Sequence, residues 1–368
     1  TSRLMEHAHA QDPVGLLVLP LDGLWPALAG TPEWTWIIGG AGVCTLMIGA
    51  FIAIFQHDLK GLLAYSTISH LGLITTLIGI GTPLAIVAAI FHILNHATFK
   101  ASLFMAAGII DHETGSRDMR RINGMWKYLP HTAVLAMVAS SAMAGVPLLN
   151  GFLSKEMFFG ETLDQHMLGS FSWLIPAAAT LAGVFSVAYS LRFIHDVFFN
   201  GEPINLPKYP PHEPPRYMKV PVEVLVFLCL LVGMLPAYTV APLLAVAAEA
   251  SVNAALPSYS LAIWHGFNLP LAMSVVALLG GILVYALRQV RGNGVALLCA
   301  AAIGALVAAG WWVTAQVGAD PFEPAPLTSL SFIGPVAEGL LYLQLAVGRE
   351  FSLGPAIVAG TLAGVLAH

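Results

Sequence analysis

The sequence predicts an all-α, polytopic membrane protein with about ten or eleven transmembrane helices. The first reason is composition. Of 368 residues, 57% are hydrophobic and only 10% are charged, whereas a soluble domain carries about 25% charged residues. The second reason is pattern: the apolar runs are about 20 residues long, which is the length of a helix that crosses about 30 Å of hydrocarbon.

Eight apolar runs define the clearest predicted spans. They lie at 35–55, 62–81, 84–110, 132–149, 173–199, 221–247, 262–287 and 293–317. Weaker runs lie at 14–29, 152–168 and 333–367, and GREFSLGP interrupts the last of these.

Two polar loops are long, at 111–130 and at the Pro-rich 200–221. The positive-inside rule favours the cytoplasmic side for both. Two predicted spans separate them, or three if 152–168 is counted, so the orientation stays open.

Composition also bounds the function. A net charge of −5 gives no reason to expect a nucleic-acid partner. The three cysteines, Cys44, Cys229 and Cys299, all lie in apolar runs without the spacing of a metal site or a disulfide framework. The first residues form no signal peptide pattern, and Thr1 in place of Met suggests a fragment of a longer subunit.

One apolar segment carries helix breakers. SSAMAGVPLLNGFLSKEMFFGETL holds Gly145, Pro147, Asn150 and Gly151. Pro removes a backbone donor and Gly loosens a helix, and transporters place such interrupted helices beside polar cavities. We therefore predict a discontinuous helix here, with Lys155 directly after the break.

His92, His96 and Lys100 are spaced i, i+4 and i+8 within FHILNHATFKASLFMAAGII, so they share one helix face. Ionisable groups in an apolar helix face a bundle interior or a water path, and imidazoles exchange protons near neutral pH. The spacing predicts part of a proton path. A zinc site on His92 and His96 is disfavoured, because the next candidate ligand is a lysine.

Lys60 in FQHDLKGLLAYSTISHLG has two interpretations. With Asp58 beside it, Lys60 could end a helix and extend to the membrane surface. Alternatively, Ser66, Thr67 and His70 continue a polar stripe from Lys60 into the helix, which favours a hydrated face.

Lys155 and Glu156 also allow two interpretations. They form a weak surface ion pair, or they are buried by the flanking aromatic residues. A buried lysine near a carboxylate would suit a protonation-coupled switch.

Three segments together carry a family resemblance: HDLKGLLAYSTISHLGL, FHILNHATFKASLFMAAGIIDHETGSRDMRRINGM and AGVPLLNGFLSKEMFF. They resemble the antiporter-like subunits shared by respiratory complex I and the Mrp-type multisubunit Na⁺/H⁺ antiporters. GIIDHETGSRD and LAIWHGFNLPL are most similar to the A-subunit branch of the Mrp group. The resemblance covers about 30–245 and extends to about 290.

The resemblance implies two inverted five-helix repeats, of which this chain holds only the second. It divides the chain into an atypical N-terminal segment (1–30), an antiporter-like half (31–250) and additional helices for subunit contacts (251–368). Two features depart from the family. The first repeat, with its own Lys and Glu, is absent, and the sequence after about 320 does not match.

The resemblance also implies a function. Lys60, Lys100 and Lys155 would form the proton path, with His92 and His96 bridging them. The supporting residues would be Asp58, Ser66, Thr67, His70 and Glu156. The chain would be a transporter subunit without cofactor or metal, exchanging protons for Na⁺ or another monovalent cation. It would work with partner subunits, among lipid, as a multi-pass protein of the bacterial inner membrane.

Two alternatives remain. The chain could belong to a redox-driven proton pump related to complex I or membrane-bound hydrogenase, in which iron–sulfur and flavin groups would lie on partner subunits. It could instead be a non-conducting assembly subunit, since small residues such as Gly280 and Gly281 suit helix–helix contacts.

Overall fold

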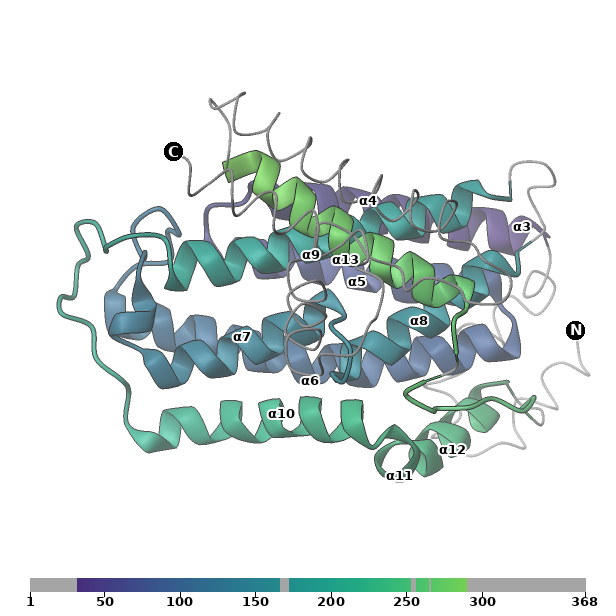
Figure 1. Cartoon of the computed structure of the whole chain (residues 1–368). Coiled ribbons are helices and arrows are strands. Elements are labelled where there is room, and N and C mark those ends of the chain that lie inside the picture. Colours follow the sequence, from purple (N-terminus) through teal and green to yellow (C-terminus); the bar gives the residue numbers. More distant parts are fainter. Residues whose placement is uncertain (1–31, 166–171, 253–255, 265, 290–368) are drawn as a thin grey trace, which may run out of the picture. The chain divides into compact units, whose positions relative to one another are not determined.

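The computed structural model describes residues 32–165, 172–252, 256–264 and 266–289. Within them the chain is helical, as predicted, and six helices are long and apolar enough to cross a membrane (Figure 1). The elements are α3 (Pro32–Trp34), η1 (Thr35–Gly39), α4 (Gly40–Phe55), α5 (Leu59–Ile80), α6 (Pro83–Thr114), η2 (Met125–Lys127), α7 (Pro130–Ala144), α8 (Asn150–Leu163), α9 (Leu174–Phe198), α10 (Arg216–Met234), α11 (Pro236–Thr239), α12 (Ala241–Val252) and α13 (Leu269–Gln289).

Local sequence sets the ends of α5 and α6. Asp58 Oδ1 accepts a hydrogen bond from the Gly61 amide at 2.7 Å and caps the start of α5. Gly81 ends α5 with φ at 73°, a left-handed conformation that suits glycine. Thr82 then caps α6 through the Ala85 amide, and Pro83 takes the first helical position.

Glycines bring α5 into backbone contact with α4 and with η1, which precedes α4. A Cβ atom added to Gly72 would lie 2.2 Å from the Leu46 amide nitrogen, and one added to Gly79 would lie 2.2 Å from that of Gly39. Such close approach is typical of membrane helices whose interfaces carry small residues. It holds α5 at a fixed height and rotation against α4.

The predicted discontinuous helix is confirmed. Helix α7 ends at Ala144, Gly145 follows with φ at 88°, and α8 begins at Asn150. Figure 1 shows α7 and α8 following one another along the bundle, each about half its length. The run 152–168 is therefore the second half of one crossing rather than a separate span.

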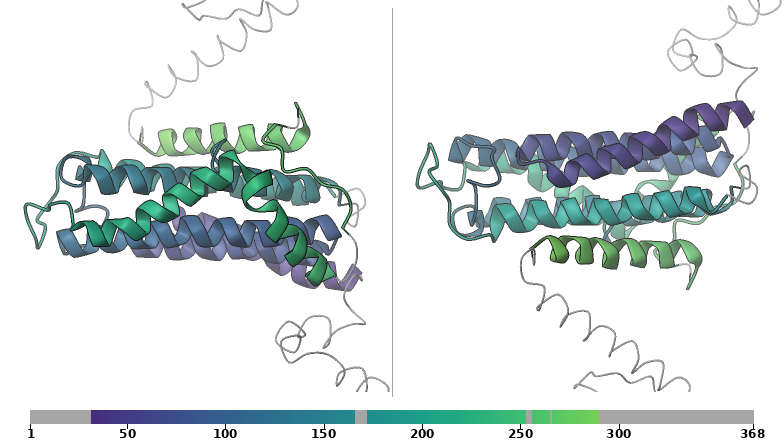
Figure 2. Two further views of the ribbon diagram at one scale, coloured as in Figure 1. Left: turned by 90° about the horizontal axis from the view of Figure 1, so that it is seen from below. Right: turned by 90° about the horizontal axis from the view of Figure 1, so that it is seen from above.

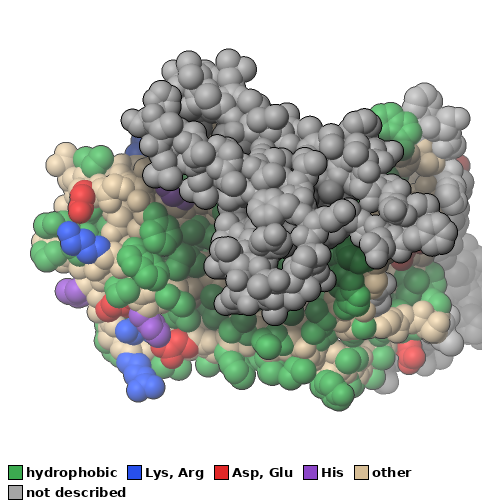
Figure 3. Space-filling model, in the orientation of Figure 1, with side chains coloured by type: hydrophobic (Ala, Val, Ile, Leu, Met, Phe, Trp, Pro, Cys, Tyr) green, Lys and Arg blue, Asp and Glu red, His purple; other side chains and the backbone are tan. Residues whose placement is uncertain are grey.

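This result places both long polar loops at one end of the bundle. One crossing by α7 and α8 followed by the return of α9 brings residues 115–129 and 199–215 together, and the Ile204 amide donates to Arg121 O at 2.9 Å. Charged side chains gather at this end in Figure 3, beside a largely apolar flank. Apart from Lys100 and Lys155, the Lys and Arg residues described between 32 and 286 all belong to it: Lys60, Arg117, Arg120, Arg121, Lys127, Arg192, Lys208, Arg216 and Lys219.

Two predicted spans have different limits in the structure. The run 221–247 is divided among α10, α11 and α12. Leu235 leaves the helical conformation because Pro236 follows it. The run 262–287 becomes helical only from Leu269, after Gly266 with φ at 80°.

The remaining helix, α13, packs along α9, as Figure 2 shows from above. Added Cβ atoms on Gly280 and Gly281 would lie 2.8 and 2.4 Å from side-chain atoms of Val184 and Val187. The predicted runs 14–29, 293–317 and 333–367 lie outside the described residues, so neither the total of ten or eleven spans nor the atypical segment 1–30 is tested.

Candidate functional site

Four helices place ionisable or hydroxyl side chains together inside the bundle. His70 comes from α5, His92 from α6, Lys155 from α8 and Tyr189 from α9. Their exposed fractions are 2%, 0%, 7% and 0%. Buried polar groups are costly unless they are hydrogen-bonded, and here they bond mainly to one another.

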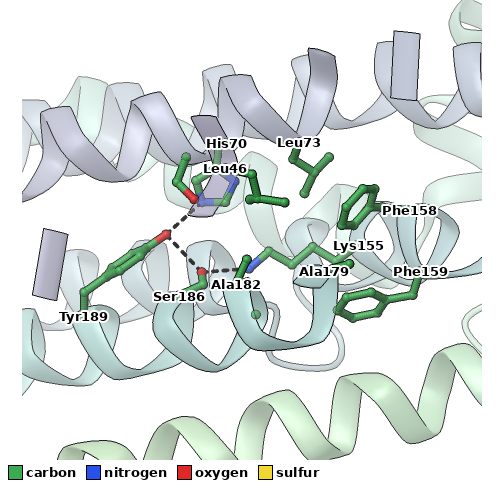
Figure 4. Close-up of a pocket in the computed structure, with 12 residues that line it drawn as sticks. Leu46, His70, Leu73, Lys155, Phe158, Phe159, Ala179, Ala182, Ser186 and Tyr189 are labelled. Carbon is green, nitrogen blue, oxygen red and sulfur yellow. Dashed lines mark hydrogen bonds between the residues drawn. The ribbon is translucent and has the colours of Figure 1, made fainter. Parts of the chain in front are cut away.

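The first half of this cluster joins α8 to α5. Lys155 Nζ donates to Ser186 Oγ at 3.0 Å, and the Tyr189 hydroxyl donates to the same oxygen at 3.0 Å. The Tyr189 oxygen lies 3.4 Å from His70 Nε2. Figure 4 shows Ser186 and Tyr189 lying between Lys155 and His70.

The second half joins α5 to α6 and α8. His70 Nδ1 lies 2.9 Å from His92 Nε2, and His92 Nδ1 lies 3.0 Å from Ser154 Oγ. Together these hydrogen bonds link six side chains in one continuous row, which we call the buried chain: Lys155, Ser186, Tyr189, His70, His92 and Ser154.

One arrangement of protons satisfies the whole buried chain with both imidazoles neutral. Ser154 donates to His92, His92 donates from Nε2 to His70, and His70 donates from Nε2 to Tyr189. Tyr189 in turn donates to Ser186. His92, His70 and Tyr189 each accept on one side and donate on the other, which is the condition for passing a proton along the row. Ser186 accepts from both Tyr189 and Lys155, so it must turn its hydroxyl before it can take part.

The helix break holds Lys155 in place. Its Nζ donates to Met143 O at 2.7 Å and to Ala144 O at 3.1 Å. These are carbonyl groups of the last turn of α7, which have no partner within the helix. The discontinuity thus creates a binding site for an ammonium group in an apolar environment.

A small cavity adjoins the buried chain. Its volume is about 20 Å³, and Lys155, His70, Ser186, Tyr189 and Phe158 are among its lining residues (Figure 4). A water needs roughly 10–15 Å³, so the space suits about one water beside the lysine.

Lys100 and His96 lie next to the buried chain. Lys100 Nζ donates to Leu63 O at 3.1 Å and to the Ser66 hydroxyl. The His96 ring lies 5.4 Å from the His70 ring, and its Nε2 atom has no partner among the described residues. Thr67 donates its hydroxyl to Leu63 O one turn earlier in the same helix.

Lys60 and Asp58 lie elsewhere, at the start of α5. Lys60 Nζ donates to Asp111 Oδ2 at 2.7 Å, and about a third of each side chain is exposed. Asp58 Oδ2 lies 3.4 Å from Arg117 Nε. The structure does not bring Lys60 to the buried chain.

Glu156 is buried but does not bond to Lys155. It accepts a hydrogen bond from Asn268 Nδ2 at 3.3 Å. The lysine–carboxylate switch considered from the sequence is therefore not formed by these two neighbours, because adjacent residues point to different sides of a helix.

The sequence interpretation missed Ser154, Ser186 and Tyr189. A signal was available in SVAYSLRF, where three hydroxyl groups at Ser186, Tyr189 and Ser190 share one face of an apolar helix. The zinc alternative is also weakened, because both ring nitrogens of His92 already bond to His70 and Ser154.

Outside the membrane-spanning segments, two loop residues have shifted pKa values. The hydrogen bond from Arg120 lowers the pKa of the Asp118 carboxyl to about 2. The hydrogen bond with Tyr209 raises the pKa of Tyr128 to about 12. The second contact links the two polar loops.

Residues 16–185 match the protein family described as "NADH:quinone oxidoreductase/Mrp antiporter, TM". This chain carries a membrane domain of that family. We call residues 16–185 the antiporter-type domain. It includes the broken helix and all of the buried chain except Ser186 and Tyr189.

Relatives of the antiporter-type domain include named antiporter subunits. The chain is 59% identical over 283 residues to the A/B-type subunit of a probable K⁺/H⁺ antiporter of Rhizobium meliloti, covering 77% of this chain and 28% of that protein. It is 38% identical over 300 residues to the A-type subunit of the Na⁺/H⁺ antiporter of Alkalihalophilus pseudofirmus, covering 72% and 36%. The chain thus spans about a third of the length of these relatives.

Solved structures agree on the fold. A chain of the Mrp complex from Dietzia sp. DQ12-45-1b superposes with a TM-score of 0.63 at 30% identity, covering 93% of this chain and 35% of that chain. A chain of respiratory complex I from Thermus thermophilus gives 0.54 at 24% identity, covering 65% and 49%. The second likeness shows the shared fold alone.

Proposed function

We propose that this chain is a proton-conducting part of a monovalent cation/proton antiporter. Protons pass between Lys155 and His92 through Ser186, Tyr189 and His70. The observation that carries this proposal is the unbroken row of hydrogen bonds between buried groups of four helices, in a domain of antiporter type.

The mechanism needs no cofactor. In the arrangement described above, protons move toward a neutral Lys155: Ser186 donates to the amine, and each group behind it passes on its own proton and accepts the next. Release from Lys155 toward His92 requires the opposite arrangement, in which each hydroxyl and imidazole first donates away from Lys155. Lys100 lies on the neighbouring helix without a carboxylate partner among the described residues. A second ammonium group in this apolar region raises the electrostatic energy of a charged Lys155 and favours release.

The other predicted residues keep roles at the margins of this path. Lys60 and Asp111 form a partly exposed pair at the end of the bundle that carries the loops, and they suit proton entry or exit. Ser66 holds Lys100, and His96 lies near His70 with an open nitrogen for a water molecule.

The membrane orientation follows from the distribution of charge. Basic residues concentrate at the end with the two polar loops, and positively charged loops face the cytoplasm. We assign that end to the cytoplasm and the Gly81–Thr82 turn to the opposite face of a bacterial inner membrane.

Complete exchange requires more than this chain. The curated relatives are more than twice as long, and they are named as antiporter subunits. Partner subunits would supply the rest of the cation path. The relatives' names include both K⁺ and Na⁺, so either ion is a candidate for exchange.

The test measures cation-dependent proton exchange in inverted vesicles from an antiporter-deficient host. The chain is expressed alone or with its partner subunits, and Na⁺ and K⁺ are compared. Lys155→Ala and His92→Ala should reduce exchange in the assembled complex, while Lys208→Ala in an exposed loop should not. Wild-type exchange in both path variants would overturn the proposal.

The same preparation separates the alternatives. Copurifying iron–sulfur and flavin subunits would favour a redox-driven proton pump, a class whose members share this fold. Normal assembly without any exchange would favour a scaffold role.

A further inference from the structure

Glu161 is a buried acidic residue that the buried chain does not use. It lies near the end of α8, and only 8% of it is exposed. Among the described residues it forms no ion pair; its hydrogen bond comes from the Thr82 hydroxyl, with 2.5 Å between Oγ1 and Oε2. A carboxylate buried without a cation is costly unless it can take up a proton.

The position of Glu161 connects it to the buried chain. Glu161 is seven positions after Ser154, which is two helical turns or about 10 Å along one face of α8. This face lies against α6, because Ser154 bonds to His92 and Glu161 bonds to Thr82. Figure 1 shows α8 running from mid-bundle toward the end where α6 begins.

Small side chains line α6 between these two contacts. Ala85 and Ala89 lie between Thr82 and His92, and both are buried in one cluster with Phe158 of α8. The interface between the two contacts is apolar and closely packed, so a proton crosses it only when water enters. This part of the α6–α8 interface is polar at both ends, at Thr82–Glu161 and at His92–Ser154, and apolar between them.

We propose that Glu161 is a proton-exchanging carboxylate that links the His92–Ser154 end of the buried chain to the membrane face at Gly81–Thr82. The inference rests on the proposed function. Glu161 takes a proton through water in the α6–α8 interface and releases it to water outside, where Asp164 is exposed one turn further on.

The surroundings of Glu161 allow both of its charge states. Burial stabilises the protonated acid. The Thr82 hydroxyl and the positive end of the dipole of the 32-residue α6 stabilise the ionised form. A group poised between the two states can load and release protons.

Two experiments on the assembled complex test the proposal. The first measures exchange in vesicles for Glu161→Gln, Glu161→Asp and the matched control Asp164→Asn, which removes an exposed carboxylate at the same helix end. We expect Glu161→Gln to lower the exchange rate about a hundredfold, Glu161→Asp to retain part of it, and Asp164→Asn to stay within about twofold of wild type.

The second experiment labels the complex with a hydrophobic carbodiimide, which reacts with protonated carboxyl groups, and locates the adduct by mass spectrometry. Labelling at Glu161 should increase as the pH falls and should slow proton exchange. Absence of labelling at every pH would overturn the proposal, even if Glu161→Gln fails to assemble.

The outcomes also distinguish a failure of the Glu161 proposal from a failure of the proposed function. Wild-type exchange in Glu161→Gln, with exchange lost in Lys155→Ala, would overturn the role of Glu161 alone. Wild-type exchange in both variants would overturn the proton path itself.

Discussion

The imidazole rings of His70 and His92 meet edge to edge across the α5–α6 interface, with centroids 5.2 Å apart and planes inclined by 14°. Their facing nitrogens lie 2.9 Å apart. Only one of the two nitrogens can carry the shared proton, so the pair acts as one unit that accepts from one side and donates to the other. Two charged rings at this distance would repel strongly.

The first prediction follows from this pairing. His70→Ala and His92→Ala should each lower proton exchange by about a hundredfold. The double variant should be no slower than the slower single variant, because residues that act as a unit are not additive. Exchange rates in vesicles, normalised to assembled complex, check this. Additive losses would contradict the shared unit.

The second prediction concerns Tyr189. Tyr189→Phe keeps the ring but removes the hydroxyl that joins Ser186 to His70. We expect an exchange rate at least about tenfold lower, with normal assembly. Tyr217→Phe, on a residue that is 76% exposed, is the control. Equal rates in the two variants would mean that protons bypass Tyr189, for instance through water in the adjoining cavity.

The third prediction concerns the contact between α4 and α5. Gly72→Ala places a methyl group against the Leu46 backbone and should lower the free energy of unfolding by on the order of 1–3 kcal/mol. Gly108→Ala in α6 is the control, since no described atom lies within 4 Å of the added group. It should be neutral or stabilising by up to about 1 kcal/mol. Melting temperatures of the purified complex in detergent compare the two.

The fourth prediction separates structural from transport roles of Lys60. Because the Lys60–Asp111 pair is about one-third exposed, its loss should cost under about 1 kcal/mol of stability. If the pair serves proton entry, Lys60→Ala should nevertheless slow exchange at unchanged assembly. The swap Lys60→Asp with Asp111→Lys should restore part of the rate. Slow exchange matched by lost assembly would instead indicate a structural role.

The fifth prediction concerns orientation. In a background without Cys44, Cys229 and Cys299, single cysteines replace Glu202 in the charged loop or Asp164 at the far end of α8. A membrane-impermeant maleimide should label Glu202→Cys in inverted vesicles and Asp164→Cys in right-side-out vesicles. The reverse pattern would place the basic end outside the cytoplasm.

Much of the fold was predictable from local sequence. Long apolar runs predict membrane helices because the bilayer sets their length. The break near Gly145 and Pro147 is predictable because these residues act on their own backbone. The division of 221–247 was missed, although the effect of Pro236 on Leu235 is local too. The short length of α8 was harder to predict from the sequence, because an apolar run does not show whether the chain crosses half or all of the membrane before it turns.

The candidate site also has a part that local sequence predicts and a part that only tertiary packing decides. The i, i+4, i+8 spacing places His92, His96 and Lys100 on one face of α6 whatever surrounds that helix. Which groups meet that face depends on how α5, α8 and α9 are rotated and set in height against it. Backbone contact at Gly72 sets α5, and the carbonyl groups freed at Met143 and Ala144 hold Lys155. Tertiary packing alone therefore joined His70 to His92 directly and to Lys155 through Tyr189 and Ser186, and left Lys60 apart at the membrane end.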